Sequence, residues 1–399
     1  MVVGSAPHVP ANAFRPQRSP VGNDAAGHSG SAGLDHGPVR GRSPLAKRAA
    51  MGPLATPPGL FFRSPRQRLA SPRPGRPGAA VMTPATSTFW ELRDVRLDGD
   101  RQPRLWVDHL EIGDGHTAIL GPSGAGKTSL LNLLVAYEHT DLGQVHCHIP
   151  RSGTRLPLFW VPSDGGLWPQ ASVAEHLRSV LPPESSPDRT GILLEMFDLV
   201  ERTDARPAEL SAGESSRLST ARGLAAGARV LVADEPLVHV DPARLACYWS
   251  EMIEDCHREN TSLIFSTHAP EQALRHADRV IGLCEGRMIA DGNTQELYRT
   301  PPSREAAECL GPVNWFTAEQ ALAWELATEE TEFGIRPRDL LVIPDESGPV
   351  EVVSSREVGA TRETRLRLLS NQASRTVTHL ADTPAPVEHQ RIRLKRRNV

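Results

Sequence analysis

The chain has 399 residues, with 44 Lys and Arg against 48 Asp and Glu, so its net charge at pH 7 is −4. This balance excludes bulk electrostatic attraction of the whole chain to nucleic acid, and the length suggests two or three domains. The 5 cysteines form no C-x-x-C pair, which favours a reduced cytosolic protein over a disulfide framework. The sequence has neither an apolar run near the roughly twenty residues of a membrane span nor the apolar core of a signal peptide.

Residues 1–84 are rich in Pro, Gly, Ser and Arg and carry 11 Lys and Arg against 2 Asp and Glu. Such a segment buries too little apolar surface to order itself. Three interpretations remain open: a disordered tail, an organelle transit peptide, and a start codon assigned upstream of the one at Met82. Of these, we favour a start codon assigned upstream of Met82, or a plain disordered tail. For the basic charge, a solvated tail is favoured over contact with anionic lipid.

Order is expected from about Phe89. Residues 90–97 and 104–112 alternate as strands do, and Asp98-Gly-Asp between them reads as a turn. The apolar residues 116–120 predict a buried strand. We therefore expect an antiparallel β layer before that strand.

A glycine-rich loop follows this buried strand and leads into a helix over 129–135. It fits G-x-x-x-x-G-K-[ST], the phosphate-binding P-loop, whose strand–loop–helix context is present here. Its glycines let successive N–H groups face phosphates, and the helix N-terminus adds partial positive charge. Lys127 is expected to reach the β- and γ-phosphates, and the Thr128 hydroxyl to ligate Mg²⁺. The candidate nucleotide-binding residues of this loop are Gly121, Pro122, Ser123, Gly124, Ala125, Gly126, Lys127, Thr128 and Ser129.

A small helical insert is predicted next. Residues 158–161 read as a strand and 162–170 as a loop. Ser172 and Glu175 form a capping box for a helix over 173–181. Further helices are expected at the segments 192–200 and from about 210 through 226.

Two polar clusters suggest metal binding. His146-Cys147-His148 lacks partners at ligand spacing, so a polar strand or loop is favoured there. Residues 229–236 are small and apolar and end in Asp234 and Glu235, which is typical of a Walker B strand. Asp234 is expected to hold Mg²⁺ beside the P-loop, and Glu235 to act as general base toward the attacking water.

A helix is predicted over 242–258 with Asp241 as its N-cap, followed by a strand over 262–268 that ends in His268. If this strand lies parallel in the same sheet, His268 falls next to the same γ-phosphate. A strand-end histidine is otherwise commonly a surface residue.

Together these motifs resemble the ATP-binding-cassette (ABC) ATPase family over about residues 89–312. The P-loop, the Leu210-Ser-Ala-Gly-Glu214 signature, the Walker B strand, the Val240-Asp241-Pro242 turn and His268 occur in the family's order and at family-like spacing. A P-loop alone leaves kinases and GTPases open, whereas this combination is specific.

The resemblance implies a head-to-tail dimer with two ATPs between the copies. Each ATP then contacts Lys127 of one copy and the signature of the other, where Ser211, Ala212, Gly213 and Glu214 are candidate binding residues. Asp241 is expected to couple the two sites, and His268 to hold the geometry of attack. Lys127, Glu235 and His268 are the candidate catalytic residues, and Thr128, Asp234 and Ser163 the candidate metal ligands.

The sequence after His268 indicates which branch of the ABC ATPase family the chain resembles. Two strands about a Glu-Gly turn over 277–292, and the segments near 294–301 and 306–316, resemble the ATPase subunits of bacterial importers for iron(III), sulfate, molybdate or polyamines. Residues 334–339 resemble the entry to their C-terminal β-barrel domain, and 350–369 alternate as strands do. The basic segment 391–397 reads as a last strand or as a solvated tail.

Four positions depart from the family pattern. Ser163 stands where the loop glutamine is expected, which concerns coupling to transport more than ATP binding. Ala212 replaces a signature glycine, and Ala269 replaces an acid after His268. No aromatic residue lies near Leu97 and Asp98 to stack on adenine, and Trp106 is only a weak substitute.

We therefore predict an α/β protein: a P-loop core with an antiparallel layer and a helical insert (about 164–226) in domain 85–312, then a barrel-like β domain over 313–399. The predicted function is ATP hydrolysis for a membrane importer of a small ion, with ATP and Mg²⁺ as cofactors. The expected partners are a second copy, an integral-membrane permease and, indirectly, an external solute-binding protein. The expected location is the cytoplasmic face of the inner membrane, with no nucleic acid bound. The alternative is a soluble ABC ATPase without a permease, regulatory or nucleic-acid linked. An inactive scaffold is disfavoured by Glu235 and His268.

Overall fold

The computed structural model describes residues 87–99, 103–151, 153–326, 332–381 and 385–397. The expectations for residues 1–84 and for Asp100 in the first turn lie outside these ranges. Among the described residues, none of the helices is long and apolar enough to cross a membrane.

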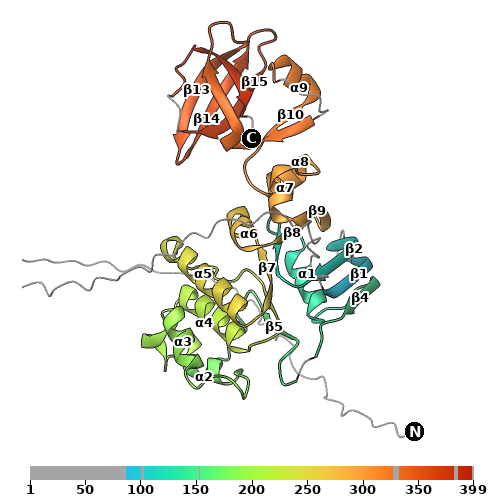
Figure 1. Cartoon of the computed structure of the whole chain (residues 1–399), viewed down its shortest axis with the longest axis vertical. Coiled ribbons are helices and arrows are strands. Elements are labelled where there is room, and N and C mark those ends of the chain that lie inside the picture. Colours follow the sequence, from blue (N-terminus) through green and yellow to red (C-terminus); the bar gives the residue numbers. More distant parts are fainter. Residues whose placement is uncertain (1–86, 100–102, 152, 327–331, 382–384, 398–399) are drawn as a thin grey trace, which may run out of the picture. The chain divides into compact units, whose positions relative to one another are not determined.

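A sheet of nine strands forms the framework of the part that contains the P-loop (Figure 1). Its strands lie in the order β4-β1-β2-β9-β8-β3-β7-β6-β5. Their bounds are β1 Thr88–Leu97, β2 Leu105–Gly113, β3 His116–Leu120, β4 Leu142–Cys147, β5 Leu158–Val161, β6 Val230–Ala233, β7 Ser262–Thr267, β8 Arg279–Cys284 and β9 Arg287–Asn293.

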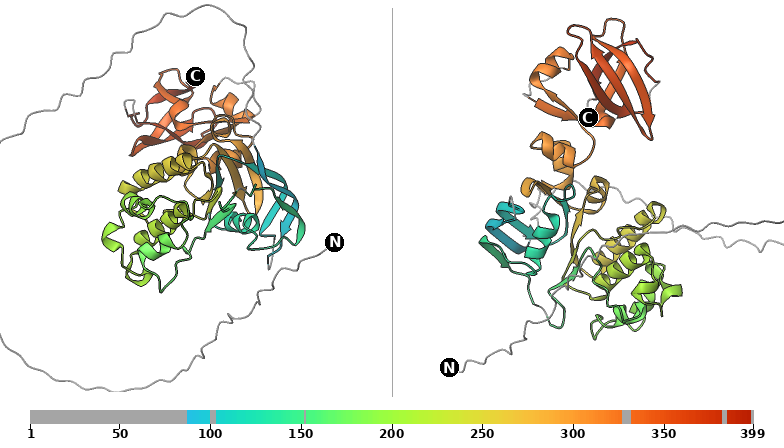
Figure 2. Two further views of the ribbon diagram at one scale, coloured as in Figure 1. Left: turned by 60° about the horizontal axis from the view of Figure 1, so that its bottom comes forward. Right: turned by 180° about the vertical axis from the view of Figure 1, so that it is seen from behind.

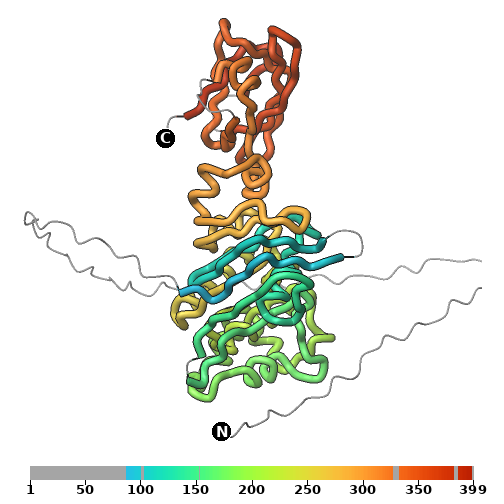
Figure 3. The backbone as a smooth tube through the Cα atoms, turned by 90° about the vertical axis from the view of Figure 1, so that its right-hand side faces the viewer, coloured from blue at the N-terminus to red at the C-terminus, as the bar shows by residue number. Residues whose placement is uncertain are grey.

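One edge of this sheet is the expected antiparallel layer, which the tube view shows as neighbouring strands (Figure 3). Strand β1 pairs antiparallel with both β2 and β4. Its residues Trp90 and Leu92 are fully buried, whereas Arg93 is exposed, because alternate side chains of a strand point to opposite faces. The alternation shifts at Asp94, which has φ of 51°, so Val95 is also buried. These buried residues pack with apolar residues of the P-loop helix in one core.

The other part of the sheet is parallel and positions the functional residues. Strand β3 pairs parallel with β7, and β7 pairs parallel with β6. Every residue of these three strands is buried, as expected for a sheet covered on both faces. Since the carboxyl ends of parallel strands meet at one edge, the P-loop, Asp234 and His268 all emerge there.

Helices surround the sheet, and α2, α3 and α4 form a cluster of their own (Figure 2). Strand β5 is followed by these helices, and α4 leads back to β6. The helix bounds are α1 Lys127–Leu134, α2 Val173–Arg178, α3 Arg189–Met196, α4 Ala212–Ala225, α5 Pro242–Arg258, α6 Pro270–His276, α7 Thr294–Arg299, α8 Arg304–Cys309 and α9 Ala318–Ala323, with short 3-10 turns at Val200–Arg202, Pro207–Glu209 and Pro337–Asp339.

The ends of two helices, α2 and α3, differ from the sequence predictions. Helix α2 has the predicted Ser172–Glu175 capping box at its start but ends at Arg178 instead of Leu181, about one turn of chain before Pro182 and Pro183. Helix α3 begins earlier than Ile192, since buried Arg189 pairs with Asp255 of α5 at 2.6 Å. It ends before the predicted Val200, because Asp198 takes a left-handed conformation with φ of 49°.

The C-terminal region is antiparallel. A two-stranded sheet joins β10 and β11, and a five-stranded sheet has the order β12-β16-β13-β14-β15. Its outer strands β12 and β15 contact each other, so the sheet curls toward a barrel. The strand bounds are β10 Asn314–Thr317, β11 Glu332–Ile335, β12 Leu340–Pro344, β13 Val350–Val358, β14 Thr361–Leu368, β15 Ser374–Leu380 and β16 Arg391–Arg396.

Strand β16 decides between the two interpretations of residues 391–397. It pairs with β12 and β13, and its Ile392 and Leu394 are buried in the core of the curled sheet. The chain therefore has the predicted mixed α/β architecture with a C-terminal β region.

Candidate functional site

The loop between β3 and α1 packs closely against neighbouring backbone because its glycines have no side chains. A Cβ atom on Gly121 would lie 2.3 Å from the Leu283 carbonyl oxygen. Gly126 has φ of +99°, and its Cβ would lie 2.8 Å from the Arg104 carbonyl oxygen. Gly124 has φ of +81°. Only glycine adopts these conformations at little cost, so the loop can turn its N–H groups inward.

Lys127 begins helix α1, and its side chain is 6% exposed. Its Nζ donates to the carbonyl oxygens of Gly121 and Pro122 at 2.9 and 3.1 Å. Its Nζ also lies 3.7 Å from Oε1 of Glu235. The ammonium group therefore sits over the loop, beside the carboxylate that follows β6.

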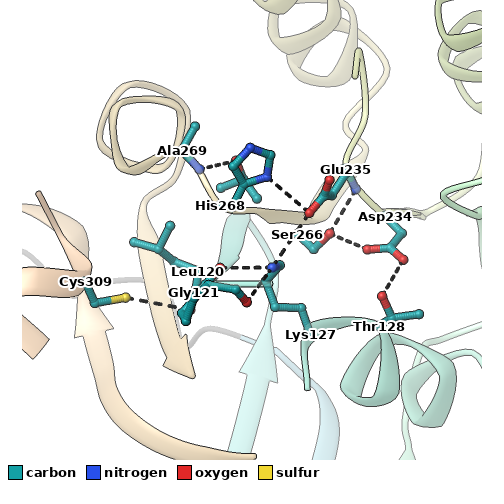
Figure 4. Close-up of polar contacts among 12 residues, drawn as sticks. Leu120, Gly121, Lys127, Thr128, Asp234, Glu235, Ser266, His268, Ala269 and Cys309 are labelled. Atoms are coloured by element: carbon teal, nitrogen blue, oxygen red, sulfur yellow. Dashed lines mark hydrogen bonds and ion pairs between the residues drawn. The ribbon is translucent and has the colours of Figure 1, made fainter. Parts of the chain in front are cut away.

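A chain of hydrogen bonds joins strand β7, the end of β6 and helix α1 at this edge (Figure 4). The Thr128 hydroxyl donates to Oδ2 of Asp234 at 2.8 Å. The Ser266 hydroxyl of β7 donates to Oδ1 of the same carboxylate and accepts from the Glu235 N–H at 2.9 Å. Asp234 is buried, so these bonds compensate a carboxylate that would otherwise be costly to remove from water.

Glu235 and His268 meet as the parallel strands suggested. The His268 Nδ1 atom lies 3.2 Å from Oε1 of Glu235. Glu235 has φ of 49°, a left-handed conformation that costs about 1–3 kcal/mol for a residue other than glycine. Its side chain is 29% exposed, so this carboxylate is open to solvent while its backbone is held by Ser266.

One cleft of about 520 Å³ is lined by many of these groups, although Ser266 and His268 are not among its lining residues. From the sequence predictions it includes Ser123, Gly124, Gly126, Lys127, Thr128, Ser129, Ser163, Asp234 and Glu235. Ser163 is exposed and reaches this cleft from the loop after β5. The structure thus brings the proposed metal and phosphate residues to one place.

Several residues of the cleft were not predicted from the sequence. Pro103, Arg104, Glu285 and Gly286 also line the cleft, from the segment before β2 and the turn between β8 and β9. No sequence motif indicates them. One feature of the sequence could have indicated Ser266: it is a polar residue within an apolar strand, two positions before His268.

Trp106, the weak substitute for the missing adenine-stacking ring, is not among the described residues that line the cleft. Its ring instead lies near the guanidinium groups of Arg96 and Arg287, at 5.6 and 5.1 Å from the ring centre. Its indole N–H donates to Asp108 at 2.7 Å.

The signature residues lie around a different hollow of about 550 Å³. It is lined by Ser211, Ala212, Gly213 and Glu214 at the start of α4, by Asp241 before α5, and by Arg217, Arg244 and Tyr248 among others. This hollow and the P-loop cleft have no lining residue in common. One chain therefore does not bring all the predicted nucleotide-binding residues around one ligand.

Local hydrogen bonds organise this hollow. The Ser211 hydroxyl accepts from the Glu214 N–H at 3.2 Å, and Glu214 accepts from the Ser211 N–H at 2.8 Å, which is a capping box. The predicted cap at α5 is also present, with Asp241 accepting from the Ala243 N–H at 2.9 Å. Gly213 lies close to the chain before Asp241: a Cβ here would be 2.9 Å from the His239 carbonyl oxygen.

Glu214 is held ionised by its surroundings. The backbone N–H of Ser211 and the guanidinium of Arg202, whose Nε lies 2.8 Å away, lower the pKa of Glu214 to about 2. Arg202 comes from the 3-10 turn after α3 and was not predicted to take part. Glu214 therefore stabilises the start of α4 as a carboxylate over the neutral pH range.

The His146-Cys147-His148 segment, considered above as a metal site or a polar strand, lies at the end of a strand. Residues up to Cys147 belong to β4, and the rings of His146 and His148 stack at 6.1 Å. Within the ranges that the structure describes, no group of three or more His, Cys, Asp and Glu could hold a metal ion. A metal in the P-loop cleft would thus depend on Thr128, Asp234 and the phosphates of a nucleotide.

Fold and cleft together define a P-loop nucleotide-binding protein. The family model described as "ABC transporter" matches residues 109–238. The sulfate/thiosulfate import ATP-binding protein CysA 2 of Chromobacterium violaceum is 32% identical over 259 residues, which cover 59% of this chain and 70% of the relative. The Fe(3+) ions import ATP-binding protein FbpC of Serratia marcescens is 32% identical, covering 55% of this chain and 67% of the relative.

Among solved structures, the ATP-binding cassette MJ0796 in a dimeric, post-hydrolysis state with ADP and phosphate matches with a TM-score of 0.44 and 20% identity. The match covers 51% of this chain and 98% of that one. The identities and coverage of the import proteins establish that the chain belongs to the ABC transporter family, as one of its ATP-hydrolysing subunits.

Proposed function

We propose that this chain is the ATP-hydrolysing subunit of a membrane importer for a small ion. One observation carries the proposal: the P-loop, Asp234 and Glu235 line a single cleft, and His268 contacts Glu235 at its edge. The importer relatives support the membrane role, since their printed names span sulfate, iron(III), molybdenum and spermidine or putrescine. We infer iron(III), sulfate, molybdate or a similar small solute as the cargo.

The cleft fits Mg²⁺ and the phosphates of ATP. The Thr128 hydroxyl and the Asp234 carboxylate are oxygen donors joined at 2.8 Å, and oxygen is the ligand that Mg²⁺ prefers. Lys127 donates hydrogen bonds to two carbonyl oxygens of its own loop and forms an ion pair with Glu235, and in the proposed complex its ammonium group turns to the β- and γ-phosphates. Ser163 offers a further hydroxyl to the metal from across the cleft. When bound, the metal neutralises charge on the transferred phosphoryl group.

Glu235 is the proposed general base. Its carboxylate is partly exposed to the cleft, so it can accept a proton from an attacking water. Ser266 fixes its backbone, and His268 and Lys127 flank its Oε1 atom at 3.2 and 3.7 Å. His268 thereby orients the carboxylate and faces the γ-phosphate position. Ala269, which follows His268, offers no carboxylate to assist Glu235.

The complete site requires a second copy. The signature hollow and the P-loop cleft share no lining residue, although a further hollow of about 250 Å³ is lined by residues of both, Asp234 and Glu235 from the cleft and Ala212 from the signature. Two chains placed head to tail would bring the signature hollow of one copy to the P-loop cleft of the other. Ser211 and Gly213 would then offer a hydroxyl and backbone N–H groups to the γ-phosphate at the start of α4. Asp241, which lines the same hollow, would couple the two sites.

We further propose that residues 85–312 form the nucleotide-binding domain, with the helical insert at about 164–226, and that 313–399 form a regulatory-like β domain. The dimer would work at the cytoplasmic face of the inner membrane beneath an integral-membrane permease. An external solute-binding protein would supply the cargo indirectly. No nucleic acid takes part.

The alternative, a soluble ABC ATPase without a permease, rests on Ser163 in place of a loop glutamine. Serine is shorter than glutamine and reaches less far toward a membrane partner. The relatives reported above are import subunits, which gives that alternative no support. The importer is therefore the preferred function.

Site-specific cross-linking tests the composite site. Cysteines placed by Ser123→Cys and Ser211→Cys belong to the two separate hollows. With a bifunctional thiol reagent and ATP, the double variant should give covalent dimers, and each single variant should give few. Equal cross-linking of the single and double variants would show that native cysteines react instead and would remove the support for the sandwich. If the double variant with ATP stayed monomeric and gave no covalent dimers, that result would contradict the head-to-tail sandwich.

A further inference from the structure

A second polar cleft lies in the C-terminal region, away from the P-loop residues. Its volume is about 620 Å³, and it is lined by Trp315 and Thr317 of β10, by residues of α9, and by the turn that enters β15. Arg304 of α8 and Arg375 of β15 both line it. The functional assignments above leave this cleft unused.

Arg375 is a half-buried cation fixed by neutral groups. Its guanidinium stacks on the Phe316 ring at 4.0 Å, donates from Nη1 to Oε1 of Gln320 at 2.9 Å, and donates from Nη2 to the Trp315 carbonyl oxygen. No ion pair of Arg375 is present among the described residues. Burial, and then the charge of Arg304, lower the pKa of the Arg375 guanidinium. The group is thus held in place without a compensating anion.

The other groups of the cleft favour an anion as well. Arg304 bonds Glu308 through Nε at 2.7 Å, and its side chain is 66% exposed. Asn371 uses its carbonyl oxygen on the Ala373 N–H, which leaves its amide N–H groups to donate. Ser374 adds an exposed hydroxyl. Glu319 is the only carboxylate among the described residues of the lining, and Glu308, outside the lining, forms an ion pair with Arg304.

We propose that this cleft binds a small molecule carrying a phosphate-like oxyanion group. Arg375 and Arg304 receive the charged group, because guanidinium forks match the geometry of such oxyanions. The hydroxyl of Ser374 and the amide of Asn371 complete the donor set. The indole ring of Trp315, which also lines the cleft, offers an apolar wall to an organic part of the ligand. The site is independent of the nucleotide cleft and goes beyond the ATPase role.

Calorimetric titration of the full chain with inorganic phosphate and with phenyl phosphate tests the proposal. A Lys127→Ala background removes binding at the P-loop. In this background at least one probe should bind saturably, and adding Arg375→Gln should weaken it by about tenfold or more, as for a lost charge-assisted contact. Tighter binding of phenyl phosphate would identify an organic phosphate as the ligand class, and equal binding would identify the free anion.

Two further variants separate a site from general charge. Arg304→Gln changes an exposed side chain, so this variant should fold. It should therefore show weakened binding even if Arg375→Gln fails to fold. Arg365→Gln removes the same charge from an exposed position of β14 outside the cleft and should leave binding unchanged. The absence of saturable binding to Lys127→Ala, or an equal loss in Arg365→Gln and Arg304→Gln, would overturn the proposal.

Discussion

The P-loop cleft and the signature hollow are built in different ways. In the cleft, polar side chains from distant segments bond one another, as Thr128 does with the buried Asp234 carboxylate across 106 residues. In the hollow, Ser211 and Glu214 bond within one helix turn, and Asp241 caps its own helix. The cleft is thus fixed by the sheet, whereas the hollow is an exposed set of helix starts.

This difference explains how a composite site can work. In the proposed mechanism the cleft holds metal and phosphates before the reaction, and a position on rigid strand ends suits its residues to that role. The hollow would meet the nucleotide only when a second copy approaches, and local capping keeps its N–H groups in order until then. Changes in the cleft should therefore affect chemistry and binding, and changes in the hollow should affect steps that need two copies.

The largest effect is expected from Glu235→Gln. The amide keeps the size of the side chain but cannot act as a base, so turnover should fall by about 10²–10⁴-fold. ATP binding should be kept, because Lys127 and Thr128 are unchanged. Measured ATP affinity and phosphate release check both statements. Unchanged turnover would remove Glu235 as the base.

Lys127→Ala should separate binding from chemistry within the cleft. Loss of two charge-assisted bonds to phosphates, at about 1.5–3 kcal/mol each, should weaken ATP binding by about 100-fold or more. Equilibrium titration with a fluorescent ATP analogue measures the affinity. Retained affinity would mean that the nucleotide does not sit on this loop.

Ser266→Ala tests the link between Asp234 and Glu235. Both lose a buried hydroxyl partner, so the free energy of unfolding should fall by about 1–3 kcal/mol and turnover by about tenfold. Ser262→Ala is the matched control, since this hydroxyl of the same strand accepts from the Gly115 N–H outside the cleft. If both variants lowered turnover equally, Ser266 would be structural only.

The two capping boxes allow a sharp test of the hollow. Ser211→Ala and Ser172→Ala remove the same cap, and each should lower the free energy of unfolding by about 1 kcal/mol. Only Ser211→Ala should lower ATP turnover, by a few-fold, because Ser172 lies outside both hollows. Urea unfolding and steady-state turnover give the two readouts. Equal turnover in the two variants would argue against a role of Ser211 toward nucleotide.

The smallest effect concerns pH. The pKa of Glu214 is depressed from 4.5 to about 2, so its contribution to stability is fully present above pH 4.5 and is lost as pH falls toward 2. The unfolding midpoint of the unchanged chain should therefore approach that of Glu214→Gln over this window. A difference between the two that stays constant over that window would show that Glu214 is not held ionised by Ser211 and Arg202.

Local sequence was enough for most of the fold. The strand ending at Asp234, the capping box at Ser172 and the helix over Pro242–Arg258 were predictable because their signals are short-range. The early start of α3 was not, since it depends on the pairing of Arg189 with Asp255, 66 residues away. Propensity yields to tertiary contacts of this kind.

The candidate site divides in the same way. The residues of the P-loop, signature and Walker B motifs could be found from their spacing, because phosphate and metal binding restrict the residue types at those positions. Arg104 and Glu285 could not, since they reach the cleft only through the meeting of β2 with the β8–β9 turn. Ser266 could have been suspected from its place in an apolar strand, but its two bonds depend on the neighbouring strand.

Recovery of the chain from native membranes tests the central claim most directly. After solubilisation and purification, mass spectrometry should identify a polytopic permease with the chain, and a solute-binding protein whose ligand indicates the cargo. Recovery from the soluble fraction alone, without a membrane partner, would contradict the importer and favour the soluble ATPase, with Ser163 marking lost coupling.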